Sequence, residues 1–195
     1  GVRIHPQFTT NRLELHLKLA DTFVFDEMPS WREVLTSAEP ERSRRLGDPA
    51  CRARMQAEWD QETGRAVAFD MGDLEIEAVR DRSNAGLVGR SVAEIAAERG
   101  TSKLDAFLDV ALAEDLQTSF RTRTSEIARE FIQFVVQAGV TDPIVMAGSS
   151  DGGAHLASFT GADYSTRLLA EWVPAGALSL EHAPTLNVTS SMAPA

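Results

Sequence analysis

Strict alternation of apolar and polar residues marks two stretches of the chain as strand candidates. Every second residue from 13 to 19 is a leucine, and between 73 and 79 three apolar residues alternate with three acidic ones. A period of two sends successive side chains to opposite faces of a strand, so each stretch predicts one buried and one wet face. Helix stays open for the first stretch, because leucine and lysine are good helix formers. Residues 2–8 and 65–69 are further strand candidates.

Several helix starts can be read from capping residues. Ser30, Ser91 and Ser102 are each followed three residues later by an acidic residue, and Asp48 stands directly before Pro49. A serine or aspartate at the N-cap accepts a hydrogen bond from the first helical turn, and proline suits the first helical position. We therefore predict a helix at each of these four points.

The C-terminal part of the chain predicts the order helix, strand, loop, helix. Residues 124–138 read as a helix that stops at Gly139. Four apolar residues fall on one side of this helix: Ile127, Phe131, Phe134 and Val135. The short apolar run 144–147 then predicts a strand buried on both faces, and residues 166–172 predict a further helix. This order is typical of α/β proteins, so an α/β fold is expected.

Composition narrows the class of protein. The 195 residues are 43% hydrophobic and 25% charged, as in globular proteins, and their formal net charge is −10. Such a charge repels nucleic-acid phosphates and anionic lipid, so neither nucleic acid nor a membrane is an expected partner. The sequence has no apolar run near the ~20 residues of a membrane span, and its first ten residues show no signal-peptide pattern. We therefore expect a cytoplasmic protein.

The most informative segment is AGSSDGGAH at residues 147–155, which directly follows the predicted buried strand. Catalytic groups collect at the carboxyl ends of such strands, where Asp151 could bind a divalent metal or act as acid and base. Gly152 and Gly153 would let a ligand approach the backbone closely. Asp-Gly is also a common turn dipeptide, so a plain turn is the alternative. For His155, too, two interpretations stay open: a loop or helix-start residue, or a ligand.

The string SDGGAH, followed by YSTRLL at 164–169 and by Trp172-Val173, resembles the last barrel-strand region of the N-acyl-D-amino-acid deacylase branch of the amidohydrolase superfamily. Further segments resemble that branch in the same order: 28–31, 46–52, 89–96 and 104–120. The resemblance covers about residues 5–183, and SDGGAH is its most specific part.

This resemblance implies a partial TIM-like (β/α) barrel, the C-terminal half of a metal-dependent amidohydrolase domain, over residues 1–183, with an irregular tail at 184–195. It implies a hydrolase that attacks N-acyl (D-)amino acids or related small amides with zinc-activated water. Asp151 would be the catalytic acid and base, and in some relatives a metal ligand. Arg167 would pair with the substrate carboxylate, although a surface helix arginine is the alternative. The substrate-binding group would be completed by three loop residues: Gly152, Gly153 and His155.

Most of that family's metal site has no counterpart here. The family uses an early His-x-His pair, a bridging Cys or carboxylated Lys, and two later histidines, whereas this sequence has four histidines and none at His-x-His spacing: His5, His16, His155 and His182. The single cysteine, Cys51, falls in a predicted helix and excludes an internal disulfide. We therefore expect zinc in the complete enzyme and weak or no binding here. A half-barrel would expose strand edges and self-associate. The alternative is a non-catalytic α/β remnant or interaction module.

Overall fold

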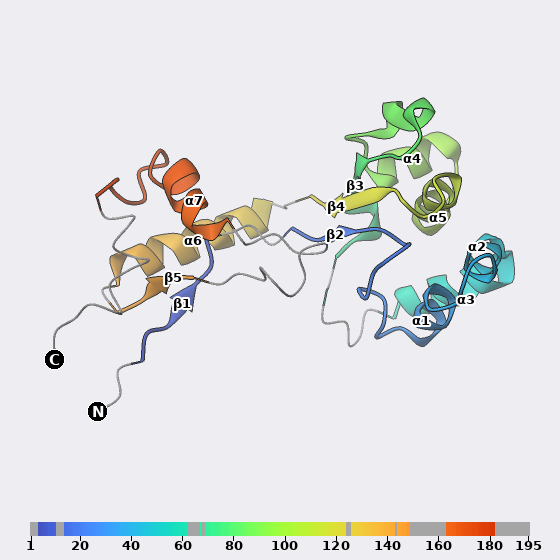
Figure 1. The fold of residues 1–195 in the computed structure, drawn as a ribbon, viewed down its shortest axis with the longest axis horizontal. Helices are drawn as coiled ribbons and strands as arrows, with labels where there is room; N and C mark the ends of the chain where they lie inside the picture. The colour runs from blue at the N-terminus through green and yellow to red at the C-terminus, as the bar shows by residue number, and fades with distance from the viewer. Residues whose placement is uncertain are drawn as a thin grey trace. The chain divides into compact units, whose positions relative to one another are not determined.

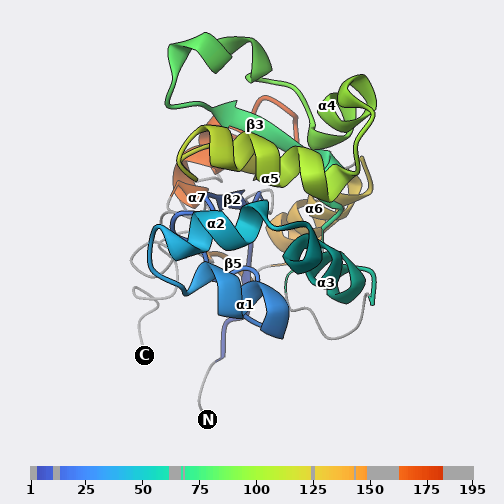
Figure 2. The ribbon, with the colours of Figure 1, turned by 90° about the vertical axis from the view of Figure 1, so that its right-hand side faces the viewer.

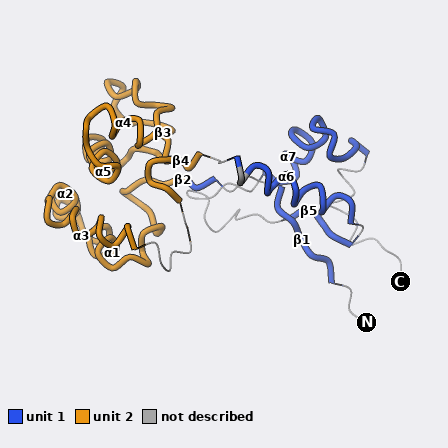
Figure 3. The backbone as a smooth tube through the Cα atoms, turned by 180° about the vertical axis from the view of Figure 1, so that it is seen from behind, with its two compact units in different colours: residues 1–15, 124–195 blue, residues 16–123 orange. Residues whose placement is uncertain are grey.

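A computed structural model shows mixed α/β structure, which confirms the predicted α/β class (Figure 1). It describes the following residues: 4–10, 14–61, 67, 69–123, 126–142, 144–148 and 163–181. The chain divides into two compact units, coloured separately in Figure 3. Unit 1 comprises residues 1–15 and 124–195, and unit 2 comprises residues 16–123, so unit 2 is inserted into unit 1 along the sequence. The described strands form two small sheets and do not close into a barrel.

Unit 2 contains an antiparallel sheet of three strands in the order β2-β4-β3. Their bounds are β2 (His16–Leu17), β3 (Leu74–Ala78) and β4 (Ser119–Thr122). The predicted alternation is confirmed, because the apolar residues on one side of these stretches are buried: Leu15, Leu17, Leu19, Leu74 and Ile76. It breaks at Ala78, which is exposed because the register shifts after Ile76. The strand predicted at 65–69 lies largely outside the described residues, and neither Val67 nor Phe69 belongs to a strand.

The described part of unit 2 also contains helices. They are α1 (Pro29–Leu35), α2 (Glu41–Gly47), α3 (Pro49–Trp59), α4 (Val92–Arg99) and α5 (Lys103–Ala113), with 3-10 turns η1 (Met71–Asp73) and η2 (Arg82–Leu87). Asp48, Ser91 and Ser102 cap their helices as predicted. The helix predicted at Ser30 is confirmed, but Ser30 is not its cap: α1 begins at Pro29, and the Ser30 amide donates to the Glu58 carboxylate at 2.8 Å. Proline already has the backbone φ of the first helical position, so the helix starts one residue earlier.

Aromatic rings form the centre of unit 2. Phe25 stacks on Trp31 with ring centroids 4.3 Å apart, and the Trp31 indole donates to the Met55 carbonyl at 3.0 Å. Helix α5 lies against the sheet (Figure 2), where Phe107 packs on Phe120 at 4.7 Å. Burial of rings of this size supplies much of the stability of a small unit. Unit 2 therefore has a core of its own.

The buried carboxylate of Glu114, at the end of α5, binds residues 80–84, the segment that follows β3. It accepts hydrogen bonds from the Arg80 amide (2.5 Å), the Asp81 amide (2.9 Å) and the Asn84 side chain. Burial raises the pKa of Glu114, but these three donors outweigh burial and hold the pKa below its usual value. The charged form of Glu114 is therefore part of the folded state.

Unit 1 is built on a parallel pair of short strands, β1 (Gln7–Phe8) and β5 (Met146–Ala147). Helix α6 (Glu126–Thr141) runs beside them, and α7 (Tyr164–Arg167) continues into the π-helical turn η3 (Leu168–Trp172) (Figure 1). The core of the unit consists of Phe8, Ile132, Val136, Val140, Ala147, Leu168 and Leu178. Among the described helices of the chain, none is both long and apolar enough to cross a membrane.

The predicted end of α6 was wrong, and the buried face of the helix does not include Phe131 and Phe134. The helix continues past Gly139 to Thr141, and its buried face is formed by Ile132, Val136 and Val140. Phe131 and Phe134 are instead 58% and 68% exposed. The reason lies in β1: a Cβ atom at Gly139 would come within 2.5 Å of the Phe8 ring, so glycine serves here as a close-contact point. The helix is thereby turned with residues 132, 136 and 139 towards the strands.

Replacing Glu114 with glutamine should destabilise unit 2 by about 2–3 kcal/mol, because buried amides would lose a charged acceptor. Since the folded-state pKa of Glu114 is lowered, its contribution is complete above the pKa of the unfolded chain and is lost as pH falls through the folded-state value. Urea denaturation of both proteins should show the difference at pH 7 and a smaller one in acid. Asp115→Asn is the control, since the exposed Asp115–Arg80 pair contributes little.

Gly139→Ala should destabilise unit 1 by roughly 1–3 kcal/mol, because the added methyl group overlaps the Phe8 ring and α6 must move away from β1. Gly47→Ala in α2 is the matched control, since no atom lies within 4 Å of the added carbon. Denaturant unfolding followed by circular dichroism measures both. An unchanged midpoint for Gly139→Ala would contradict the close contact.

Candidate active site at the carboxyl ends of β1 and β5

The parallel strands β1 and β5 end at the same edge of their sheet. Gln7 lies opposite Met146 and Phe8 opposite Ala147. The Met146 amide donates to the Pro6 carbonyl at 2.9 Å, and the Gly148 amide donates to the Phe8 carbonyl at 3.0 Å. In α/β proteins this carboxyl edge is where ligands and catalytic groups are found. Gly148 leads from this edge into the segment that contains Asp151.

Gly148 packs closely against the neighbouring strand. A Cβ atom here would lie 2.8 Å from the side-chain carboxamide carbon of Gln7, and Gly148 itself is buried. A larger residue would push the Gln7 side chain away from the strand pair. Because this carboxamide is the end of a flexible side chain, a substitution at Gly148 would displace the Gln7 side chain rather than the strands.

Four residues of the predicted site cannot be placed at this edge. Asp151, Gly152, Gly153 and His155 lie outside the described residues. Their assignments as catalytic acid and base, close-approach glycines and site histidine stay predictions.

Arg167 is described, and it is held by two carboxylates of its own helical segment. Its Nε donates to Asp163 at 2.9 Å and its Nη1 donates to Glu171 at 2.7 Å. The side chain is 19% exposed, and no hydrogen bond of Nη2 to another described residue is found. Arginine can bind a carboxylate with two parallel N–H donors, but here any incoming anion competes with Asp163 and Glu171. The three groups together carry one net negative charge, which weakens the attraction for an anion.

Thr10 and Trp172 fasten the Arg167 segment to the end of β1. The hydroxyl of Thr10, a fully buried residue, donates to the Tyr164 carbonyl at 2.9 Å. The Trp172 indole donates to the Thr10 carbonyl at 3.1 Å. The contact joins residues more than 150 positions apart, and sequence reasoning missed it because nothing around Thr10 distinguishes that threonine. Arg167 is thus carried by a segment anchored at the carboxyl edge.

The helix after Arg167 changes its hydrogen-bond pattern. Val173 donates to the Leu168 carbonyl and Ala177 to the Trp172 carbonyl, each at 3.0 Å and each across five residues. Such π-helical turns are uncommon and often occur at functional sites. Here the turn follows Arg167 directly while Leu168 stays buried in the core.

Of the described histidines and cysteine, only His5 belongs to unit 1. His5 Nδ1 is 2.9 Å from the Ile144 carbonyl, at the opposite, amino edge of the strand pair. His16 belongs to unit 2 and pairs with Glu77 at 3.0 Å. Burial raises the pKa of Glu77, but hydrogen bonds from His16 and Ser119 lower it overall. Cys51 is buried in α3, so it is a core helix residue.

Metal-binding side chains do not cluster in the part of the chain that the structure describes. No three His, Cys, Asp or Glu residues come close enough there to hold an ion. The described residues therefore do not fit a zinc site by themselves.

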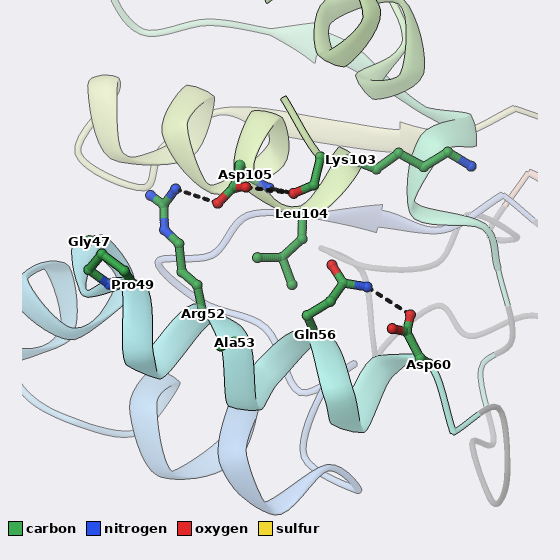
Figure 4. Close-up of a pocket in the computed structure, with 10 residues that line it drawn as sticks. Gly47, Pro49, Arg52, Ala53, Gln56, Asp60, Lys103, Leu104 and Asp105 are labelled. Atoms are coloured by element: carbon green, nitrogen blue, oxygen red, sulfur yellow. Dashed lines mark hydrogen bonds and ion pairs between the residues drawn. The ribbon is translucent and has the colours of Figure 1, made fainter. Parts of the chain in front are cut away.

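Unit 2 has a pocket of about 610 Å³ between α3 and the start of α5 (Figure 4). Its polar groups are engaged: Arg52 donates to Asp105 at 2.9 Å and Gln56 to Asp60 at 2.7 Å, whereas Lys103 donates to Asp70 at 3.0 Å. Arg52 also donates to Asp109 at 2.7 Å. The two Arg52 pairs hold α3 against α5, whereas the Gln56–Asp60 pair lies within the α3 segment.

Comparison with known proteins finds relatives among the mycobacteria. One uncharacterized protein of Mycobacterium bovis and two of Mycobacterium tuberculosis are each 30% identical over 172 residues. The match covers 87% of this chain and 27% of each relative, so the chain spans about a quarter of their length. No protein-family model matches the chain. No solved structure gives a significant match.

Trp172→Phe should loosen the Arg167 segment by about 1 kcal/mol, because phenylalanine keeps most of the packing but cannot donate to the Thr10 carbonyl. Hydrogen exchange of the amides in residues 164–177 should speed up by roughly fivefold, the factor equivalent to that free energy. Amides of α5 in unit 2 serve as the internal control. Unchanged exchange in residues 164–177 would show that the indole bond does not anchor the segment.

Proposed function

We propose that this chain is part of a metal-dependent amide hydrolase that acts on N-acyl-D-amino acids or related amides. The observation that carries the proposal is the order β1, α6, β5 with the two strands parallel and the Asp151 segment following β5 directly. Parallel strands joined through a helix are the repeating unit of a TIM-like barrel, and barrel enzymes place catalytic residues just after their strands. Asp151 stands three residues beyond Gly148 in the sequence.

The packing around α6 supports a partial TIM-like fold over residues 1–183. The helix covers one side of the strand pair through Ile132, Val136 and Val140, with Phe8 and Ala147 beneath them. Unit 2 enters the chain between β1 and α6, which in a barrel is a loop at the catalytic face. Such loops tolerate large insertions because the barrel strands do not depend on them.

In the proposed enzyme, each residue has a binding or proton-transfer role. Asp151 would take a proton from the attacking water and deliver it to the leaving amine nitrogen. Arg167 would bind the substrate carboxylate through the donors that Asp163 and Glu171 leave open. Gly152 and Gly153 would let the substrate approach the backbone, with His155 beside it. In the complete enzyme, zinc would supply activated water, but its ligands would have to come from residues other than those described.

A second candidate is an α/β interaction module without metal chemistry. One observation favours it: α6 exposes two phenylalanines, as an interaction surface would. Zinc measured by mass spectrometry on the purified chain distinguishes the candidates, since a stoichiometric ion removed by Asp151→Asn would favour the hydrolase.

The carboxylate role of Arg167 predicts that N-acetyl-D-amino acids bind the chain and that their methyl esters do not. Arg167→Ala should weaken binding of the acids by about 10–100-fold, the loss equivalent to a charge-assisted hydrogen bond. Asp163→Asn should strengthen it by roughly twofold, because one competing i,i+4 carboxylate is removed. Titrations followed by NMR at low salt measure these changes.

The control for this titration is Arg32→Ala, which removes an exposed arginine of unit 2 and should leave binding unchanged. Equal binding of acid and ester, or no loss on Arg167→Ala, would exclude a carboxylate site at Arg167. The aspartate role of Asp151 would then need separate support.

A further inference from the structure

A hollow of about 440 Å³ lies at one end of the three-stranded sheet of unit 2, where β2 and β3 end and β4 begins. Six residues line it: Lys18, Ala78, Val79, Arg80, Gln117 and Ser119. Two of these residues are cations and none is a carboxylate, although the whole chain carries a net charge of −10. The hollow is therefore a candidate site for a negatively charged group.

The positive side of the hollow has donors to spare. Lys18 and Gln117 are exposed, and their side chains make no hydrogen bond to another residue that the structure describes. Arg80 donates to Asp115 at 2.6 Å through Nη1, but a guanidinium has five N–H donors, so others remain for a ligand. An ammonium and a guanidinium on one wall can bind a carboxylate together.

A negative charge lies behind the opposite wall. The Ser119 hydroxyl donates to Glu77 Oε2 at 2.8 Å, so its oxygen can offer only lone pairs to the hollow. His16 Nδ1 lies 3.0 Å from the same Glu77 oxygen. Burial raises the pKa of Glu77, but these hydrogen bonds hold the pKa below its usual value, so Glu77 is charged at neutral pH. This wall therefore favours a positively charged donor.

Two backbone irregularities shape the hollow. The register of β3 against β4 shifts at Glu77, which makes it the extra residue of a bulge. Asp115 and Leu116, directly before Gln117, both have positive φ, at 53° and 62°. Leucine seldom takes this conformation, and both kinds of irregularity are common beside functional sites. The bulge brings Glu77 next to Ser119, and the turn leads Gln117 to the hollow.

We propose that this hollow binds a small zwitterion, a free α-amino acid, with its carboxylate on the Lys18 and Arg80 side and its ammonium on the Ser119 side. Glu77 supplies the countercharge behind Ser119. The two apolar lining residues suit a small aliphatic side chain. The site belongs to unit 2, and it rests neither on the proposed hydrolase activity nor on Arg167.

Titration with DL-alanine, followed by NMR of the amides of residues 18, 117 and 119, tests the ligand class. Two derivatives each remove one charge: N-acetyl-DL-alanine lacks the ammonium, and DL-alanine methyl ester lacks the carboxylate. Each should bind at these residues at least about tenfold more weakly than DL-alanine, because one charge-assisted hydrogen bond is lost. Equal binding of DL-alanine and its N-acetyl derivative would mark a site for anions only and overturn the zwitterion. No shift at these amides with DL-alanine would overturn the site altogether.

Substitutions test the two walls. Lys18→Gln should weaken DL-alanine binding roughly tenfold, and because Lys18 is exposed the variant should fold. Lys103→Gln is the matched control, since this lysine of α5 pairs with Asp70 outside the hollow, and it should leave binding unchanged. Glu77→Gln should reduce the preference for DL-alanine over its N-acetyl derivative. Unchanged affinity in Lys18→Gln, or an equal loss in Lys103→Gln, would contradict the proposal.

Discussion

The contact between the Phe8 ring and the backbone of α6 at Gly139 holds unit 1 together. Strands β1 and β5 contribute only two residues each, too little for an isolated pair to persist in water. Their stability must come from burial under α6, and Phe8 is the side chain of β1 that reaches that helix core. Because Phe8 also sets the register against Ala147, the same contact fixes where the two strands end. The candidate site depends on that edge.

Local signals in the sequence predicted local structure well. The caps at Asp48, Ser91 and Ser102 involve residues three positions apart, so their geometry is determined within one helical turn. Ser30 is not a cap for an equally local reason, since Pro29 offered a better first helical position. The choice between the two apolar faces of α6 could not be predicted in this way. It depends on Phe8, whose ring is more than 120 residues away in the sequence.

In the candidate site, too, local features could be predicted from the sequence and long-range contacts could not. The Asp151 segment is recognised from consecutive residues, and the spacing of Asp163, Arg167 and Glu171 along one helix face is visible in the sequence. That spacing already indicates that Arg167 is paired with its own neighbours, a competition which the family resemblance alone does not suggest. The bonds that anchor this segment, from Trp172 to Thr10 and from Thr10 to Tyr164, have no sequence signal. They exist only because β1 and the C-terminal segment meet in the fold.

The surfaces of the two units differ in composition: paired charges are prominent on unit 2, and exposed apolar side chains on unit 1. This difference bears on function. In unit 2, charged residues are paired across the sheet and between helices, as where Glu75 accepts from both Arg121 and Arg123. In unit 1, by contrast, most of the exposed large apolar residues of the described chain are found: Ile4, Phe131, Phe134, Ile144, Leu169 and Leu180. A unit that closes its own surface can be inserted into a loop without disturbing its host. Unit 1 carries most of the exposed apolar surface of the described chain, so further contacts of this polypeptide are to be sought there.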